Sequence, residues 1–393
     1  MKIGVLTYHA EINFGSVLQT YAVQEVFKSL GHEVEIIDRW MDPVNRYAKG
    51  PLVDLTVTSL LKICLRWLFD VGELARLMRH VKTQAFKQAH LKLSAFHFYD
   101  WKDAPACLDY DVISVGSDQV WNANLFNPND YLLAQLNARI ARMSFAASMG
   151  MTFIPDQYKK AYQTELPKYI CVSVREQSAV DILAEIGVVA DKILDPTLIV
   201  DKAIWDRFVP KRNCATRKLV VYVLAEDMSA MLPKIMDFCR LNQCSASVFA
   251  DNDILRERRT VNGLISTFRL RMRLKLAKIK LCLAADPSDF VREIASATWV
   301  ATNSFHALMF ATIYRKNTRI IKPTDPVRLQ MHSRMKEFGE TFIKGPLMQE
   351  SVEKAMYSLE HDEAIMYNEL PLNEEVEKSR QWLEKALRKV PKC

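Results

Sequence analysis

The stretch WVATNSFHALMF, residues 299–310, contains the pattern that decides the fold of this chain. A short run of β-forming residues ends at Asn303, Ser304 is a typical helix N-cap residue, and the apolar residues after it continue as a helix. The same order occurs at the amino terminus, where KIGVLTY is followed by a polar turn and the helical pattern SVLQTYAVQEVFKSLG. Strands that alternate with helices in this way are typical of parallel sheets with crossover helices.

The chain has 393 residues, which is more than one hydrophobic core normally supports. A new series of strands begins at KLVVYVLA, after a proline-containing polar stretch near residue 200. We therefore predict an α/β fold with two doubly wound Rossmann-like domains, residues 1–200 and 201–375, that face each other across a cleft. Residues 45–100 are predicted to form a helical insertion without a strand, and residues 376–393 a C-terminal helix that packs on either domain.

Composition excludes several classes of protein. Hydrophobic residues make up 49% and charged residues 25%, as in soluble globular proteins and unlike disordered chains. The eight cysteines are scattered without a CxxC pair, which argues against a disulfide framework and against a zinc site. No apolar run reaches the roughly 18 residues that a membrane-spanning helix requires, and the first residues read as a buried strand rather than a signal peptide. We expect a cytoplasmic protein with reduced thiols.

The net charge of +7 is concentrated in one segment, residues 256–280, which contains nine lysines and arginines and one glutamate. Such a segment is a solvated face, a nucleic-acid patch or a membrane-surface helix. Leucine, isoleucine, phenylalanine and methionine alternate with the charges, which favours an amphipathic element at a membrane surface over a DNA-binding arm. We therefore predict peripheral membrane contact and no nucleic-acid partner.

In open α/β sheets, ligands bind beyond the carboxyl ends of the strands. The first loop in such a position contains Asn13, Gly15 and Ser16 and opens a helix, whose free backbone N–H groups favour an anion. Gly15 would allow the backbone to approach a ligand closely. The alternative is that Asn13 and Ser16 only form the turn and the helix cap.

The second loop lies in VISVGSDQVWN, residues 112–122, where Gly116 again allows close approach to a ligand. Ser117, Asp118 and Gln119 follow the strand directly and are predicted to line the same cleft. Asp118 is a candidate base or hydroxyl acceptor. Its alternative role is to cap the next helix.

Two further strand ends carry side chains suited to an anionic ligand. Arg175 follows a β-branched strand in CVSVREQSA, where a guanidinium can bind carboxylate or phosphate through two hydrogen bonds. Its alternative role is a surface ion pair with Glu176 or Asp181. His306 lies in the first helical turn after Asn303 and Ser304, a position suited to a general acid acting on an anionic substrate. A hydrogen-bonded packing role is the alternative for this histidine.

Six segments together resemble the polysaccharide pyruvyl transferase family. They occur in the family's order, over residues 1 to about 340, and are TYHAEINFGSVLQTYAVQ, DVISVGSDQVWN, ARMSFAASMG, SVREQSAV, LDPTL and TNSFHALMFATIY. The resemblance implies a fold like that of GT-B glycosyltransferases and transfer of pyruvate from phosphoenolpyruvate onto a sugar as a cyclic ketal. It also implies that no metal and no cofactor is needed.

The resemblance places the family's catalytic histidine at His306 and a donor-binding arginine at Arg175. Relatives often have an arginine just before the histidine, where this chain has Ser304 and Phe305. Arg334, or a lysine such as Lys322, is therefore the candidate for the second cation that binds the donor. His306 would protonate the methylene carbon of phosphoenolpyruvate, and Asp118 would accept the proton of a sugar hydroxyl.

The resemblance further implies an acceptor attached to a lipid carrier at the inner face of the cytoplasmic membrane, with galactose bridged as a 4,6-ketal. Two other functions remain open. A GT-B glycosyltransferase that uses a nucleotide-sugar donor would have the same fold. A glycan-binding protein without turnover would also keep it.

Overall fold

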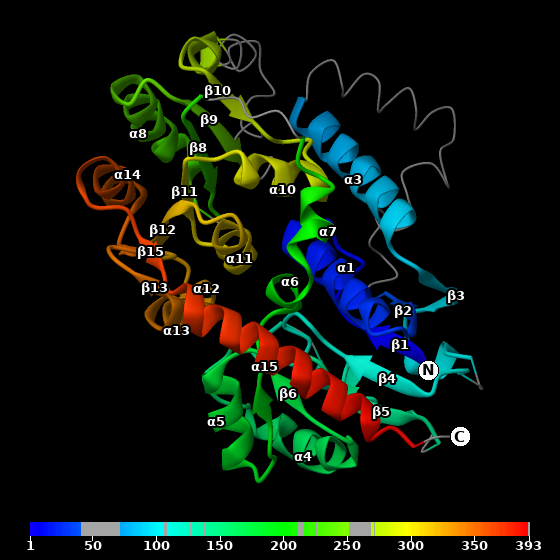
Figure 1. Ribbon diagram of the computed structural model, residues 1–393. Helices are drawn as coiled ribbons and strands as arrows, with labels where there is room; N and C mark the ends of the chain where they lie inside the picture. Colours follow the sequence, from blue (N-terminus) through cyan, green and yellow to red (C-terminus); the bar gives the residue numbers. More distant parts are fainter. Residues whose placement is uncertain are drawn as a thin grey trace, which may run out of the picture. The chain divides into compact units, whose positions relative to one another are not determined.

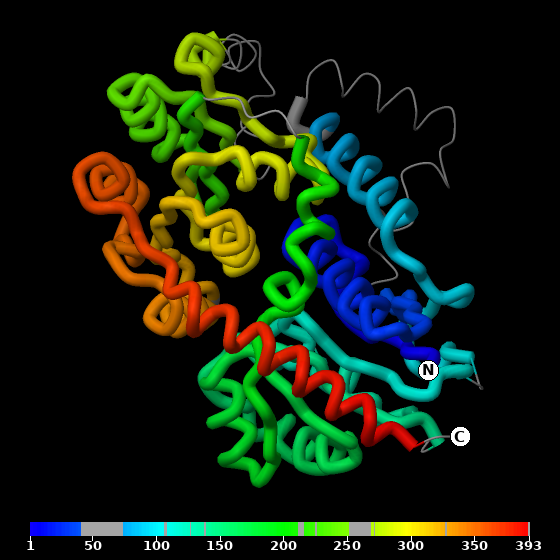
Figure 2. Tube along the Cα trace, in the orientation of Figure 1, coloured from blue at the N-terminus to red at the C-terminus, as the bar shows by residue number. Residues whose placement is uncertain are grey.

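The computed structural model describes residues 1–40, 71–105, 108–125, 127–136, 139–210, 216–224, 226–250, 269–270 and 272–391 (Figures 1 and 2). The chain forms two compact units. Unit 1 consists of Met1–Asn45, Lys87–Lys202 and Asn368–Cys393, and unit 2 of Arg46–Phe86 and Ala203–Tyr367. The chain therefore returns to unit 1 at its carboxyl end.

Unit 1 is built on a five-stranded parallel sheet with the order β3-β2-β1-β4-β5 (Figure 1). Its strands are β1 Lys2–Leu6, β2 Glu33–Arg39, β3 Leu93–Phe98, β4 Val112–Val115 and β5 Ala141–Ser144. A short parallel pair, β6 Ser173–Val174 and β7 Asp191–Lys192, lies beyond β5. The chain moves outward from β1 in both directions, so the carboxyl ends of β1 and β4 form the switch point where ligands bind in such sheets.

Two helices of unit 1 start at a residue whose side chain caps them, Asn13 and Asp195. Asp195 caps a helix that begins with Pro196, a residue favoured in the first turn. The C-terminal helix is held in this unit by three side chains, since Ser379, Arg380 and Trp382 hydrogen-bond to Leu194, Ile199 and Asp191. The helices of this unit are α1 Phe14–Ser29, α4 Asp156–Glu165, α5 Gln177–Glu185, α6 Pro196–Ile199 and α15 Glu369–Arg388. The helix α3 Val71–His90 is divided between the units, and only its residues from Lys87 onward belong to unit 1.

Unit 2 contains a six-stranded parallel sheet with the order β10-β9-β8-β11-β12-β14. Its strands are β8 Lys218–Tyr222, β9 Ser245–Phe249, β10 Ile279–Leu281, β11 Trp299–Thr302, β12 Asn317–Ile321 and β14 Met348–Gln349. A small antiparallel pair joins β13 Ile343–Lys344 to β15 Met366–Tyr367. By the same topological rule, the switch point of unit 2 lies at the carboxyl ends of β8 and β11.

The helices of unit 2 cover this sheet and pack apolar faces against it. One of them begins with a capping box, in which the side chains of Asp286 and Asp289 each accept a hydrogen bond from the other residue's backbone N–H. The helices are α7 Lys202–Asp206, α8 Met228–Leu241, α10 Pro287–Ala295, α11 Phe305–Ile313, α12 Pro326–Met331, α13 Ser333–Phe342 and α14 Val352–His361.

The predicted α/β class with two doubly wound domains is confirmed, but three details of the predicted organisation are wrong. The segment 45–100 contains a strand, β3, at the edge of the first sheet; its short run with Ser94, Ala95 and His97 lacks the apolar pattern of a central strand. Residues 71–86 of the same segment group with unit 2, where Phe86 packs on Phe208. The C-terminal helix begins at residue 369 rather than 376 and belongs to unit 1.

Most of the basic segment at 256–280 lies outside the described residues, as does the part of the helical insertion at 45–70. Of the basic segment's described residues, Leu276 is exposed and Leu274 is buried. Within the described parts of the chain, no helix combines the length and apolar character that crossing a membrane requires.

A buried glutamate ties three strands and a helix of unit 2 together. Glu293 on α10 accepts hydrogen bonds from Lys218 at the start of β8, from Ser247 on β9 at 2.7 Å and from Lys280 on β10 at 2.8 Å. Burial opposes ionisation of this carboxyl, but these donors outweigh it and lower its pKa from 4.5 to about 2. A carboxyl whose pKa is lowered in the folded state stabilises the fold above its unfolded pKa and loses that effect as the pH falls toward the folded value.

We expect Glu293→Gln to lower the free energy of unfolding by about 2 kcal/mol at pH 7, because it removes charge-assisted hydrogen bonds. The difference between variant and wild type should shrink as the pH falls from about 5 toward 2, where the unfolded wild-type chain also binds the proton. Urea unfolding at several pH values measures this. Glu353→Gln, which removes an exposed carboxylate paired with Lys234, is the control and should have little effect. An equal loss of unfolding free energy for Glu293→Gln at pH 7 and pH 3 would contradict the lowered pKa of Glu293.

Candidate functional site

The switch point of unit 1 is closed by a hydrogen bond between the loops that follow β1 and β4. The Thr7 hydroxyl donates to the carbonyl of Ser117 at 2.8 Å, and both residues are buried. Gly116 and Asp118 have positive φ angles of 109° and 76°. A side chain at Gly116 would place its Cβ 2.6 Å from the carbonyl oxygen of Phe145, so only glycine fits there. The loop is therefore held in one conformation with Asp118 at its turn.

The predicted residues of this loop have different surroundings. Asp118 is 13% exposed, and its Oδ1 accepts the backbone N–H of Gln119. No helix follows it in residues 108–125, so the capping alternative for Asp118 is wrong. Gln119 accepts a hydrogen bond from Asn122, and Ser117 is buried with its hydroxyl 3.4 Å from Asp195. Asp118 is the member of this set whose carboxylate retains contact with solvent.

Arg175 is buried in an ion pair that the sequence did not indicate. Its side chain is 1% exposed, and Nη1 lies 2.7 Å from Oδ2 of Asp195, a fully buried carboxylate. Nη2 lies 3.7 Å from Oδ1 of Asp118, and Nη1 lies 3.5 Å from the Ser117 hydroxyl. The predicted alternative, an ion pair with Glu176, is present, with Nε 3.8 Å from Oε2, but it is buried rather than at the surface. The donor-binding role of Arg175 stays a prediction. Asp195 caps α6 through one oxygen and brings the other to the guanidinium.

The loop at the start of α1 forms a cap rather than an open anion site. Oδ1 of Asn13 accepts the backbone N–H groups of Gly15 at 2.9 Å and Ser16 at 3.4 Å. The Ser16 hydroxyl donates to the carbonyl of Tyr8. The amides that were predicted to bind an anion are therefore occupied, because the asparagine side chain reaches them first. The turn-and-cap alternative is confirmed for Asn13 and Ser16, and Gly15 lies buried in the helix.

In unit 2 the loops after β8 and β11 are also joined by a side chain. The amide of Asn303 donates to the carbonyl of Leu224 at 3.0 Å and accepts its N–H at 2.7 Å. These two bonds extend the β8–β11 pairing beyond the strand ends. The side chain of Asn303 therefore holds the switch point together, and its predicted contact with substrate stays a prediction.

His306 lies in the first turn of α11, as predicted, and the residue is 8% exposed. Ser304 stands at the N-cap, but its side chain makes no cap hydrogen bond, in contrast to Asn13 at α1. The backbone N–H of Ser304 is bound by the hydroxyl of Thr302 at 3.0 Å. The positive end of the α11 dipole is thus not compensated by a side-chain oxygen of the N-cap residue.

Arg334 on α13 reaches the same helix end. Its guanidinium carbon lies 5.2 Å from the centre of the Phe305 ring, a distance typical of a cation–π contact, and Nε donates to the carbonyl of Met331. The Phe305 and His306 rings are neighbours, with centroids 5.6 Å apart. The structure therefore brings together Ser304, Phe305, His306 and Arg334. Lys322 pairs with Glu350 at 3.2 Å on the surface.

Two buried groups near the predicted residues were missed. Oε1 of Glu176 accepts hydrogen bonds from the Ser148 hydroxyl and the N–H groups of Met149 and Gly150. His9 lies 2.9 Å from Oδ1 of Asp38, at the carboxyl ends of β1 and β2. Both His9 and Glu176 occur inside the quoted motifs, so their position was visible, but their partners are distant in sequence.

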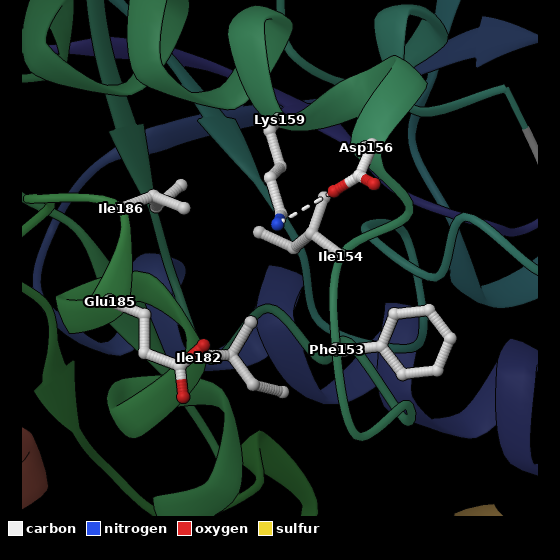
Figure 3. Close-up of a pocket in the computed structure, with 7 residues that line it drawn as sticks. All are labelled: Phe153, Ile154, Asp156, Lys159, Ile182, Glu185 and Ile186. Atoms are coloured by element: carbon white, nitrogen blue, oxygen red, sulfur yellow. Dashed lines mark ion pairs between the residues drawn. The ribbon is translucent and has the colours of Figure 1, made fainter.

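A small pocket in unit 1, of about 120 Å³, lies apart from these residues (Figure 3). Phe153, Ile154 and residues of α5 line it, and an ion pair of 2.7 Å between Lys159 and Asp156 crosses its rim. None of the predicted site residues lines this pocket.

A family model for polysaccharide pyruvyl transferase matches residues 13–325, which is most of the chain. The chain belongs to the polysaccharide pyruvyl transferase family. Among curated proteins, none matches the sequence significantly. The family assignment makes this chain a transferase that acts on a polysaccharide.

Several solved structures are similar to this member of the family at low sequence identity. UDP-N-acetylglucosamine 2-epimerase from Rickettsia bellii has a TM-score of 0.51 and 10% identity, with 98% of this chain and 95% of that chain covered. UDP-GlcNAc 2-epimerase from Methanocaldococcus jannaschii has a TM-score of 0.49, 13% identity and coverage of 98% and 100%. MurG of Acinetobacter baumannii has a TM-score of 0.43, 10% identity and coverage of 97% and 95%. The predicted GT-B-like fold is confirmed.

The Gly116 geometry gives a test of the switch-point loop of this pyruvyl transferase. Gly116→Ala should lower the free energy of unfolding by at least about 2 kcal/mol, since the methyl group adds a clash with Phe145 to an unfavourable φ. Gly187→Ala is the matched control, because Gly187 also has a positive φ, 78°, but no atom near the added carbon. It should cost about 1 kcal/mol. Chemical denaturation measures both, and equal losses would contradict the described loop.

Proposed function

We propose that this protein transfers pyruvate from phosphoenolpyruvate onto a hexose of a lipid-linked precursor of a bacterial surface polysaccharide, and that galactose receives it as a 4,6-ketal. The arrangement at the start of α11 carries the proposal: His306 lies in the first turn, and Arg334 stands over the adjacent Phe305. These groups match a small ligand with several negative charges. The family assignment supplies the pyruvyl transfer.

Phosphoenolpyruvate carries a phosphate and a carboxylate, so its binding site needs more than one positive group. The N-terminus of α11 provides backbone N–H groups and the positive end of a helix dipole. Arg334 provides a guanidinium that can bind an oxyanion through two hydrogen bonds while its face rests on Phe305. Arg334 thus takes the place of the arginine that relatives carry directly before the histidine. Arg175 acts as a positioning residue, since its charge is neutralised by Asp195.

The proposed reaction begins with a proton transfer to carbon. His306 gives a proton to the methylene carbon of phosphoenolpyruvate, which leaves positive charge on C2 and draws in a sugar hydroxyl. Phosphate then departs and a second hydroxyl of the same sugar closes the ketal ring. Asp118 accepts a hydroxyl proton, as its partly exposed carboxylate allows. The second hydroxyl returns a proton to His306, and the proton held by Asp118 leaves with the phosphate, so these two residues account for the proton transfers and the proposed steps require no metal or cofactor.

Phosphoenolpyruvate should raise the melting temperature of the wild-type protein, because a ligand that binds only the folded state stabilises it. UDP-galactose and UDP-N-acetylglucosamine should not. His306→Gln should keep this shift but lose acceptor-dependent phosphate release by a factor of at least about 100, the usual contribution of a general acid. Arg334→Gln should lose the shift itself.

The control for these variants is Arg240→Gln, which removes an exposed arginine of unit 2. A shift with nucleotide-sugars but none with phosphoenolpyruvate would favour the glycosyltransferase alternative. Binding of glycans without any phosphate release would favour a protein without turnover. A large fall in the melting temperature of His306→Gln would indicate a packing role. The added pyruvyl mass on a panel of lipid-linked sugars identifies the acceptor.

We propose that the basic segment attaches the protein to the cytoplasmic face of the membrane, where a lipid-linked acceptor is found. The support is the alternation of basic and apolar residues in 256–280. Co-sedimentation with vesicles that contain anionic lipid should fall sharply when Arg269, Arg271, Arg273 and Lys275 are changed to glutamine. Unchanged binding of this variant would refute the proposal.

A further inference from the structure

A group of polar residues at the carboxyl ends of β1 and β2 has no role in the proposed donor site. It contains His9 and Glu11 from the loop after β1, Asp38 and Trp40 from the end of β2, and Lys87 near the end of α3. Such a position, beside the switch point of an open sheet, is where ligands of α/β proteins bind.

The carboxylate of Asp38 is fixed through one oxygen and open through the other. Oδ1 accepts hydrogen bonds from the His9 ring at 2.9 Å and from the indole N–H of Trp40 at 2.5 Å. Oδ2 accepts none from the described residues, and 17% of the side chain is exposed. Burial alone would raise the pKa of Asp38, but the hydrogen bonds and charge of His9 and the Trp40 bond outweigh it, so the pKa is lowered. Asp38 is therefore an oriented, ionised acceptor at neutral pH.

Trp40 and the neighbouring strand hold this acceptor in place. The backbone N–H of Trp40 bonds to the carbonyl of Phe98 at 2.9 Å, and the backbone N–H of Asp38 bonds to the Ser94 hydroxyl at 3.0 Å. The indole is partly exposed beside the carboxylate that its N–H binds. An aromatic ring next to a fixed carboxylate offers an apolar surface and a hydrogen-bond acceptor to the same ligand.

Lys87 limits the charge of this group. Its Nζ donates to the carbonyl of Ala10 at 2.9 Å, and the side chain is 3% exposed. Burial lowers its pKa to about 8, while Glu11 and Asp38 act in the opposite direction. Lys87 offsets one of the two carboxylates. A site with an open carboxylate oxygen and no surplus of positive charge suits a neutral ligand rich in hydroxyl groups better than an anion.

This group is connected to the loop that carries Asp118. The second ring nitrogen of His9 lies 3.3 Å from the carbonyl of Thr7, and the Thr7 hydroxyl donates to Ser117, the residue before Asp118. The charge of Asp118 also acts on Tyr8, the residue before His9, whose pKa is raised mainly by burial. The open oxygen of Asp38 and the carboxylate of Asp118 therefore belong to one hydrogen-bonded loop system in unit 1.

We propose that Asp38, Trp40 and His9 form a sugar-binding site, in which the open oxygen of Asp38 accepts a hydroxyl of a pyranose and the Trp40 ring packs on its C–H face. His9 is a positioning residue that orients the carboxylate. The geometry alone supports a sugar-binding site. That the bound sugar is the acceptor of the pyruvyl group rests on the proposed function.

Saturation-transfer NMR of the full chain with methyl β-galactoside, methyl β-glucoside, methyl α-mannoside and methyl N-acetyl-β-glucosaminide tests the site without turnover. The wild type should bind at least one of them. Asp38→Asn should raise its Kd about tenfold or more, because a charged acceptor is replaced by a neutral amide. Trp40→Ala should do the same, and Trp40→Phe, which keeps an aromatic ring, should lose less. Asp156→Asn, which changes an exposed carboxylate of the same unit, is the control.

Two results would overturn the inference: no binding of any glycoside by the wild type, or binding that Asp38→Asn and both Trp40 variants leave unchanged. The change in melting temperature with phosphoenolpyruvate tests the proposed function separately from the sugar-binding site. Sugar binding that depends on Asp38, without any effect of phosphoenolpyruvate, would retain the site and reject pyruvyl transfer from that donor. A shift with phosphoenolpyruvate but no sugar binding at Asp38 would do the reverse. If Asp38→Asn fails to fold, the comparison of Trp40→Phe with Trp40→Ala decides.

Discussion

A parallel sheet ends at its carboxyl edge with backbone N–H and C=O groups that no further strand can pair, and the fold depends on satisfying them. In unit 2 the amide of Asn303 bonds to both backbone groups of Leu224, and in unit 1 the Thr7 hydroxyl binds the carbonyl of Ser117. Each of these contacts crosses the switch point of its own sheet. Because they fix the loops after the central strands, they also fix every side chain that those loops present to a ligand.

This requirement divides the polar residues after the strands into two kinds. Asn13, Asn303, Arg175 and Glu176 make hydrogen bonds or ion pairs within the protein, and they hold loops and helix ends in place. Asp38 and Asp118 keep contact with solvent. The buried pair of Arg175 and Asp195 illustrates the difference, since removal of either partner would leave an uncompensated charge in the interior. A residue already bound in this way contributes to a ligand site by position rather than by contact.

The sequence predicts the fold far better than the roles of individual residues. The strand patterns KIGVLTY, VISV, KLVVYVLA and WVATN predicted β1, β4, β8 and β11, because local pattern and burial agree there. Strand β3 was missed since an edge strand needs no such pattern. The bonds of Asn303 to Leu224 and of Arg175 to Asp195 were missed because these partners, 79 and 20 residues away, become neighbours only after folding. The positions of His306 and Ser304 followed from local capping rules alone.

The contact of Arg334 with Phe305 shows how a charge can be supplied from a different part of the chain. Arg334 arrives from α13, and its guanidinium rests on the ring of Phe305, the residue directly before His306. The ring shields one face of the guanidinium from water and restricts its motion, while its edge remains available for hydrogen bonds. Phe305 and Arg334 therefore act together. Without Arg334 the start of α11 lacks this cation, and without the Phe305 ring Arg334 loses the surface that orients its guanidinium.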